Sequence, residues 1–202
     1  MGRRFIAGCD EVGRGALLGP LYAAAVILDP LITISGIDDS KKLTARRRES
    51  LAAEIRSKAL AWQVVAVTAE EIDALNIYEA SRQGMLRALS RLNPAPDYVL
   101  TDAMPLRENG ADYCVPHRAI LHGDSRSISI AAASILAKVA RDAHLGELDG
   151  LFPQYGLAKN KGYGTHQHLT ALARFGPCAE HRKSYQPVKD YLLPLFTSVL
   201  PA

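Results

Sequence analysis

Cysteine is scarce in this chain, and the few cysteines it has are isolated. The 202 residues include three of them, Cys9, Cys114 and Cys178, and none belongs to a Cys-x-x-Cys pair. This spacing argues against a zinc motif and against a disulfide framework. A reduced, cytoplasmic setting is therefore the expected location.

Long apolar runs are also missing. The longest, residues 16–28, contains a glycine and a proline and is too short to span a bilayer. The opening Met-Gly-Arg-Arg leads directly into an expected strand, so no signal peptide is predicted. Because no internal repeat or low-complexity segment is visible either, we expect a folded domain with no membrane partner.

The net charge is only +3 and by itself indicates no partner. Its distribution is uneven, since residues 40–58 and residues 159–189 each carry a net charge of +5 and leave −7 on the rest of the chain. Two basic segments beside an acidic body fit a polyanion that is bound over a carboxylate site. Two helices whose basic faces are exposed to water, with no bound partner, would give the same distribution of charge.

Hydrophobic patterning predicts a mixed α/β chain. Strands are expected at residues 4–10, 21–28, 61–67, 98–101 and 119–121, and helices at 44–58, from 69, at 77–92, 125–145 and 166–175. The helix at 125–145 is rich in small residues, which would let its backbone lie close to a sheet. Early strands followed by alternating helices and strands predict one mixed sheet with helices on both faces.

Four acidic residues stand where an expected strand ends or a helix begins. They are Asp10 and Glu11 after the first strand, Asp102 after the fourth, and Asp124 before the long helix. Strand ends at one edge of an α/β sheet converge on a shared crevice, where four carboxylates repel one another unless cations neutralise them. Hard oxygen ligands favour Mg²⁺ or Mn²⁺, and two such ions suit in-line displacement at phosphorus.

Each acidic residue also has an ordinary structural alternative. Asp124 could cap the long helix, and Asp102 could be a turn residue. Neighbouring residues of a strand face opposite ways, so Asp10 and Glu11 can share an ion only if the strand ends between them. Gly13, two residues further on, favours such a break.

Three further segments carry groups that suit nucleic acid. The Gly13-Arg14-Gly15 turn offers backbone groups that can approach a sugar edge without a Cβ clash, and a 2′-hydroxyl both donates and accepts. Ser40, Lys41 and Lys42 place a hydroxyl and two ammonium groups at an expected helix N-terminus, which can bind phosphate. Tyr163, between glycines among positive charges, could stack on a sugar or base.

These three segments have plain alternatives as well. The glycines could form a simple tight turn, the lysines could solvate the start of a helix, and the tyrosine could be structural. His166 could act as an acid or a phosphate contact, although an isolated histidine is more often structural.

Taken together, the segments resemble ribonuclease HII, the type 2 ribonuclease H family. The resemblance spans nearly the whole chain, follows the family's order and is highly specific as a joint pattern. The matching motifs are Asp10-Glu11-x-Gly13-Arg14-Gly15, Asp39-Ser40-Lys41-Lys42-Leu43, Asp102, Gly123-Asp124-Ser125, Ala137-Lys138-Val139-x-Arg141-Asp142, Gly162-Tyr163-Gly164-Thr165 and His181-Arg182-x-Ser184-Tyr185.

The resemblance implies a ribonuclease H-like fold, with a five-stranded mixed sheet flanked by helices in residues 1–150. Residues 151–202 would be a helical extension that contributes to substrate binding. The resemblance also implies a monomeric endoribonuclease that uses Mg²⁺ or Mn²⁺ to cleave the RNA strand of RNA–DNA hybrids. Such an enzyme nicks duplex DNA 5′ to a single embedded ribonucleotide, leaving 5′-phosphate and 3′-hydroxyl ends.

Roles follow by position in the family's motifs. The catalytic metal ligands would be Asp10, Glu11, Asp102 and Asp124. Gly13, Arg14 and Gly15 would read the 2′-hydroxyl, Tyr163 would stack at the RNA-to-DNA step, and Ser40, Lys41 and Lys42 would hold phosphates. Asp142 rivals Asp124 as the fourth ligand, but it lies about 27 Å further along a helix, so both cannot line one site. We choose Asp124, at the helix N-terminus.

The chain departs from the family's pattern at four places. Ala16 stands where proline is frequent, Leu18 where alanine is frequent, Ala103 where glycine is common, and Tyr185 where phenylalanine is frequent. None of these removes a chemical group that the mechanism needs.

Three other functions remain open. The sister family ribonuclease HIII carries an extra N-terminal substrate-binding domain, which is not expected here because the first motif begins within ten residues of Met1. A nucleic-acid-binding module could use its carboxylates for a structural ion. An unrelated phosphoesterase would act on small phosphate esters and ignore the 2′-hydroxyl.

Overall fold

The computed structural model describes residues 5–38, 40, 43–108 and 110–192. The chain folds into two compact units. The first holds the chain up to Val12, Tyr22–Ala66 and Ser81–Ala140; the second holds Gly13–Leu21, Val67–Ala80 and the chain from Arg141 onward. The division at residue 150 that the sequence suggests stays a prediction.

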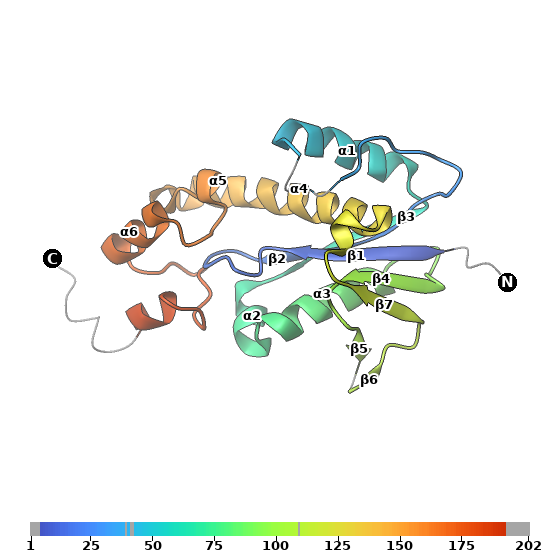
Figure 1. The fold of residues 1–202 in the computed structure, drawn as a ribbon. Coiled ribbons are helices and arrows are strands. Elements are labelled where there is room, and N and C mark those ends of the chain that lie inside the picture. Colours follow the sequence, from blue (N-terminus) through green and yellow to red (C-terminus); the bar gives the residue numbers. More distant parts are fainter. Residues whose placement is uncertain (1–4, 39, 41–42, 109, 193–202) are drawn as a thin grey trace. The chain divides into compact units, whose positions relative to one another are not determined.

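Five strands form the main sheet (Figure 1). Their spatial order is β3 (Ala61–Val67), β2 (Leu21–Ile27), β1 (Ile6–Val12), β4 (Tyr98–Asp102) and β7 (His117–Ile120). β1 is antiparallel to β2 and parallel to β4, which is in turn parallel to β7. The sheet is therefore mixed and five-stranded, as predicted. A small ribbon of β5 (Arg107–Glu108) and β6 (Ala111–Asp112) was not predicted.

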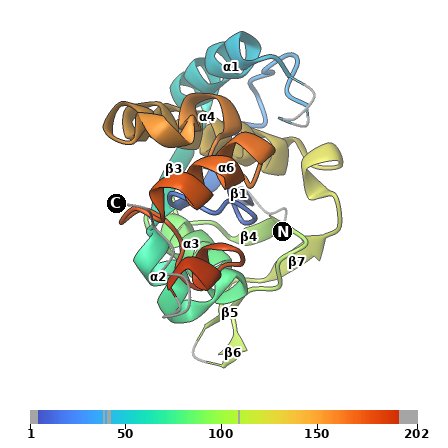
Figure 2. The same cartoon turned by 90° about the vertical axis from the view of Figure 1, so that its left-hand side faces the viewer.

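Helices cover both faces of this sheet. α1 (Ala45–Lys58) and the first part of α4 (Ile128–Leu151) lie on one face, and α3 (Ile77–Ser90) lies on the other (Figures 1 and 2). On the first face, buried side chains of β2, α1 and α4 form one apolar core. Its α1 members are Leu51, Ala52 and Ile55, the stripe that the sequence pattern predicts.

The start of α4 lies directly on β1 at Gly8. A Cβ on Gly8 would overlap the backbone of Ser129 and Ile130, so only glycine allows this approach. The small residues that follow in α4, among them Ala132 and Ala133, are fully buried. The expected close packing is confirmed, although the helix begins three residues later and ends six residues later than the predicted 125–145.

The second unit contains α2 (Ala69–Leu75), α5 (Leu157–Asn160) and α6 (His166–Phe175). Two apolar clusters hold it together. One contains Leu18, Leu145, Leu148, Tyr155, Leu157 and Ala171, and the other contains Leu17, Leu172 and Val188. Among the described residues, no helix combines the length and the apolar character that crossing a membrane requires.

Candidate active site

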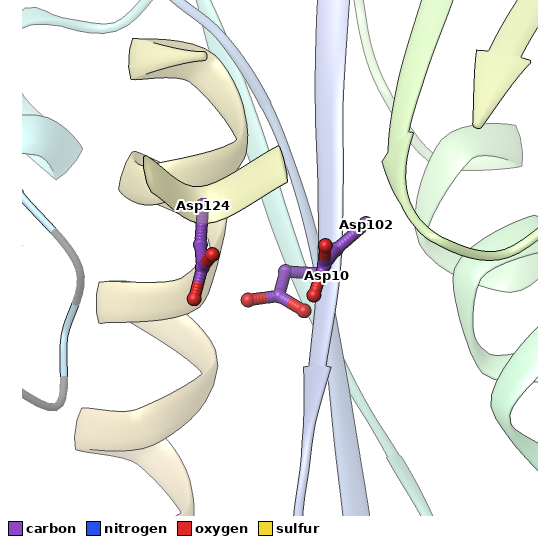
Figure 3. Close-up of side chains that lie close together, drawn as sticks. All are labelled: Asp10, Asp102 and Asp124. Carbon is purple, nitrogen blue, oxygen red and sulfur yellow. The ribbon is translucent and has the colours of Figure 1, made fainter. Parts of the chain in front are cut away.

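Three aspartates from separate elements point toward one another (Figure 3). Asp10 comes from β1, Asp102 is the last residue of β4, and Asp124 lies in the 3₁₀ turn Gly123–Ser125 that precedes α4. One carboxylate oxygen from each lies within 4.8 Å of the others. Asp10 and Asp124 are buried, at 5% and 7% exposure. The structure therefore brings together three of the four predicted ligands.

Strand pairing and one hydrogen bond place these three carboxylates. The parallel register sets Cys9 beside Thr101, so the next residues, Asp10 and Asp102, lie at the same edge. The Asp102 carboxylate then accepts a hydrogen bond from the Gly123 N–H at 2.7 Å, which ties β4 to the turn that carries Asp124. Since α4 begins only at Ile128, Asp124 is not its N-cap, and helix capping does not explain this aspartate.

Glu11, the fourth predicted ligand, is not one of the three grouped residues. The expected strand end between Asp10 and Glu11 is wrong, because β1 continues through Val12, which pairs with Tyr22. The two side chains therefore leave the strand on opposite faces. The Glu11 N–H donates to the Asp10 carboxylate at 2.7 Å, so its backbone orients Asp10. A ligand role for its carboxylate stays a prediction.

Electrostatics make this corner receptive to a cation. Burial raises the pKa of Asp10 well above its usual range, and the nearby charges of Glu11 and Asp102 raise it further. A buried group of carboxylates is costly when charged unless a positive ion offsets the repulsion. The donor set is three hard oxygens, the kind that Mg²⁺ and Mn²⁺ prefer. The residues present therefore fit a divalent cation.

Ser40 lies in a turn and not at a helix N-terminus as predicted, since α1 is capped by Thr44 and begins at Ala45. Its hydroxyl lies 2.8 Å from the hydroxyl of Ser134 on α4, and both are buried. Ser134 in turn hydrogen-bonds Asp10, which favours the charged carboxylate. When Asp10 is charged, the Ser134 hydroxyl donates to its carboxylate, and the Ser134 oxygen then accepts from the Ser40 hydroxyl. Lys41 and Lys42 lie outside the described residues.

Replacing Ser134 with alanine removes the hydroxyl that steadies Asp10. We expect the apparent affinity for Mn²⁺ to fall by about tenfold, because groups that orient metal ligands contribute on this scale. The measurement is the Mn²⁺ concentration that gives half-maximal cleavage. Ser57→Ala, which removes an exposed hydroxyl on α1, is the matched control. Equal Mn²⁺ requirements for wild type and Ser134→Ala would show that this serine does not support the site.

Ala103, where the family commonly has glycine, adopts a left-handed conformation with φ of 51°. Its N–H donates to the Ile120 carbonyl at 3.0 Å, so the chain turns immediately after Asp102 while staying tied to β7. Glycine adopts this conformation at lower cost than alanine, which gives a physical reason for the common glycine.

In the second unit, Arg141 holds the turn that carries the Gly-Arg-Gly motif. Its guanidinium is fully buried and donates to the carbonyls of Pro20 at 3.0 Å, Lys161 at 2.9 Å and Leu18 at 3.3 Å. Gly13 has φ of 95°, and a Cβ there would overlap the Arg141 side chain. Gly13 is therefore required both by its backbone conformation and by the arginine packed on it.

Arg182 holds the same turn from another direction. Fully buried, it donates two hydrogen bonds to the Gly19 carbonyl, at 3.0 and 2.9 Å, and one to the Arg14 carbonyl at 2.8 Å. The Tyr185 hydroxyl also donates to the Arg14 carbonyl, at 2.7 Å. The phenylalanine that is frequent in the family would lack this donor. With these carbonyls fixed, the turn is held in one conformation, in which Arg14 and Gly15 are exposed residues.

Tyr163 lies beside this turn in the second unit. It forms an isolated antiparallel bridge with Ala16, and its ring lies against Gly15, 3.9 Å from where a Cβ would be. The Arg141 guanidinium lies over the ring, 5.5 Å from its centroid. Tyr163 is 37% exposed, so ring surface remains accessible to a ligand. His166, the first residue of α6, is exposed, and its part in the chemistry stays untested.

Sequence reasoning missed the residues that position this machinery. Arg141 and Arg182 belong to the quoted motifs, but nothing in their spacing assigns them to the Gly-Arg-Gly turn. Ser134 is one of the small residues of α4, for which the sequence predicts only close packing against the sheet. A polar residue within a run of buried alanines was the available signal, because a buried hydroxyl needs a partner.

The family model of ribonuclease HII matches residues 7–188 of this chain. The chain belongs to the ribonuclease HII family. Ribonuclease HII of Solibacter usitatus is 53% identical over 190 residues, which cover 94% of this chain and 81% of that protein. Among solved structures, ribonuclease H2 of Pyrococcus horikoshii aligns with a TM-score of 0.78 and 25% identity, covering 92% of this chain and 96% of that one.

Membership in the ribonuclease HII family establishes the protein as an endoribonuclease of the ribonuclease H class, a metal-dependent hydrolase that acts on nucleic acid. It also confirms the ribonuclease H-like fold. The Mn²⁺ complex of Bst-RNase HIII aligns with a TM-score of 0.73 over 93% of this chain and 69% of that one. At 18% identity, this likeness shows the shared fold alone. The family match therefore favours ribonuclease HII over its sister family.

Proposed function

We propose that the protein cleaves the RNA strand of RNA–DNA hybrids and nicks duplex DNA 5′ to single embedded ribonucleotides. The products carry 5′-phosphate and 3′-hydroxyl ends, and the enzyme acts as a monomer. The observation that carries the proposal is the group of Asp10, Asp102 and Asp124, with oxygens within 4.8 Å of one another, in a chain of this family.

Asp10, Asp102 and Asp124 would hold the divalent ions, Mg²⁺ or Mn²⁺, with Glu11 as the further ligand that the family resemblance implies. Support comes from the oxygen-only donor set and the raised pKa of Asp10, which a cation would offset. When bound, divalent ions lower the pKa of a water and neutralise charge on the leaving oxygen. The aspartates orient this chemistry, and Ser134 and the Glu11 N–H orient Asp10.

Recognition of the ribonucleotide is assigned to the second unit. The backbone of Gly13, Arg14 and Gly15, of which the last two residues are exposed, is proposed to pair with the 2′-hydroxyl, which DNA lacks. Tyr163 is proposed to stack where RNA meets DNA. Ser40, which belongs to the first unit, is proposed to contact phosphates together with Lys41 and Lys42. Support comes from the buried guanidiniums of Arg141 and Arg182, which preorganise the turn and leave its outer side accessible.

A labelled DNA duplex with one ribonucleotide tests the proposal. In Mg²⁺ or Mn²⁺ we expect one nick on the 5′ side of the ribonucleotide, with a 3′-hydroxyl that a polymerase extends directly. An all-DNA duplex is the matched control and should remain intact. Binding without cleavage would indicate a nucleic-acid-binding module. Hydrolysis of small phosphate esters, with no preference for the ribonucleotide, would indicate an unrelated phosphoesterase.

A further inference from the structure

Two buried histidines of the second unit face each other through their ring nitrogens. The Nε2 atoms of His168, on α6, and His181 are 3.2 Å apart, and both residues are at most 1% exposed. The far nitrogen of each ring also has a partner. His181 Nδ1 lies 3.0 Å from the Cys178 backbone N and 3.2 Å from its sulfur, and His168 Nδ1 lies 3.0 Å from the Tyr163 carbonyl oxygen.

These partners permit only one arrangement of protons when both rings are neutral. The Cys178 N–H is an obligatory donor, so His181 Nδ1 must accept and its proton must be on Nε2. Burial raises the pKa of the Cys178 thiol, which keeps a second donor at the same nitrogen. At the other end, the Tyr163 carbonyl can only accept, so His168 must carry its proton on Nδ1. His181 Nε2–H then donates to His168 Nε2, and every group is satisfied.

We propose that His168 and His181 are positioning residues for substrate discrimination, a neutral hydrogen-bonded pair that fixes the main chain of Tyr163 and thereby its ring. This inference rests on the proposed role of Tyr163 as the reader of the RNA-to-DNA step. The backbone link runs from Cys178 through both imidazoles to the residue beside the Gly-Arg-Gly turn. Thr165, two residues after Tyr163, caps α6, so the pair anchors the segment that leads into that helix.

Protonation breaks this arrangement. A proton added to either imidazole would place an N–H against the Cys178 N–H or against the other ring's N–H. Burial, together with the facing His168, lowers the pKa of His181 to about 4, and burial lowers the pKa of His168 as well. The other titratable or charged groups around the pair are Tyr155, whose ring packs on both imidazoles, Cys178, Glu180, and the residues that share a hollow with His181: Glu70, Asp73 and Lys183.

The sign of the stability effect follows from proton binding. The unfolded chain takes up protons on these histidines near pH 6.5, about their ordinary pKa, whereas the folded pair resists them. The free energy of unfolding should therefore fall as the pH drops from about 6.5 toward 4, and the two histidines should contribute no loss above about pH 7.

Nitrogen-15 NMR of the histidine side chains of the whole protein tests the pair directly, without substrate or metal. We expect the Nε2–H tautomer for His181 and the Nδ1–H tautomer for His168 at about pH 7.5, with the His181 ring still neutral at about pH 5.5. The opposite tautomer for either ring, or a charged ring at neutral pH, would overturn the proposal. Because this measurement is made on the wild type, it does not depend on whether any variant folds.

Two substitutions at His168 then test the link to discrimination. Asparagine can still donate to the Tyr163 carbonyl, whereas leucine cannot. We expect His168→Leu to lower cleavage at an embedded ribonucleotide by about tenfold, with a smaller loss on a continuous hybrid, and His168→Asn to restore most of it. His144→Asn, on α4 outside the pair, is the control.

Equal losses on both substrates, or no rescue by asparagine, would contradict the positioning role. If Tyr163→Ala itself leaves the substrate preference unchanged, the proposed role of Tyr163 fails. The tautomers would in that case still report on the histidine pair alone, so the two failures are distinguishable.

Discussion

Asp10→Asn is expected to abolish cleavage while leaving binding of an RNA–DNA hybrid intact. Asp10 is buried at the centre of the three-aspartate group, so the amide removes one charged oxygen ligand from the proposed metal site. Loss of several kcal/mol of transition-state stabilisation corresponds to a decrease of about a thousandfold or more in turnover. Binding should persist, because phosphate contacts with basic and backbone groups dominate affinity for nucleic acid.

The same substitution should stabilise the metal-free protein. Burial and two neighbouring carboxylates raise the pKa of Asp10, so its charged form costs stability at neutral pH. Asparagine removes that cost, and we expect the unfolding midpoint to rise by about 2–4 °C. The gain should shrink as the pH falls, because the wild-type carboxyl then takes up a proton. Thermal unfolding in the presence of a chelator, at neutral and acidic pH, measures both effects.

Asp142→Asn is the matched control for Asp10→Asn, since Asp142 is the rival ligand that does not belong to the grouped aspartates. It should keep most of the wild-type turnover. Wild-type activity from Asp10→Asn would remove Asp10 from the mechanism. Inactivation by Asp142→Asn, with its fold and hybrid binding intact, would transfer the ligand role to that residue.

Tyr163→Ala should impair cleavage at a single embedded ribonucleotide far more than cleavage of a continuous hybrid. Stacking of one base on an aromatic ring contributes about 1–3 kcal/mol, which is about 5- to 150-fold. A continuous hybrid offers ribose at every step, so it depends less on recognition of one junction. The measurement is the ratio of the two rates under single-turnover conditions.

Tyr163→Phe provides the control, because it keeps the ring and removes only the hydroxyl. It should retain the wild-type preference between the two substrates, and the Arg141 guanidinium should still lie over the ring. Equal losses on both substrates with Tyr163→Ala would argue against reading of the junction. A selective loss with Tyr163→Phe would assign the role to the hydroxyl instead of the ring.

Much of the fold could be predicted because its signals are local. The strand at residues 61–67 and the helix at 166–175 have the predicted bounds, since alternating or periodic apolar residues and flanking caps mark them. The end of β1 was misplaced because Asp10 and Glu11 read as a polar boundary. Pairing with β2 carries the strand on to Val12, and such pairing is not visible in a linear sequence.

The candidate site was predictable as a set of residue types at strand ends, but not as a set of contacts. Parallel pairing of β1 and β4 brings Asp10 and Asp102 together across 92 positions, which only the topology rule suggests. The buried partners were not predictable. Ser134 and Arg141 act on groups that are distant in sequence, and most of their partners are backbone carbonyls or a hydroxyl, which leave no spacing pattern.

The most direct test of the central claim is an anomalous diffraction experiment on crystals of the protein soaked in Mn²⁺. We predict a manganese peak within coordination distance of carboxylate oxygens of Asp10, Asp102 and Asp124, and its absence in Asp10→Asn crystals treated in the same way. Manganese bound elsewhere, with these three carboxylates empty in an active enzyme, would contradict the account.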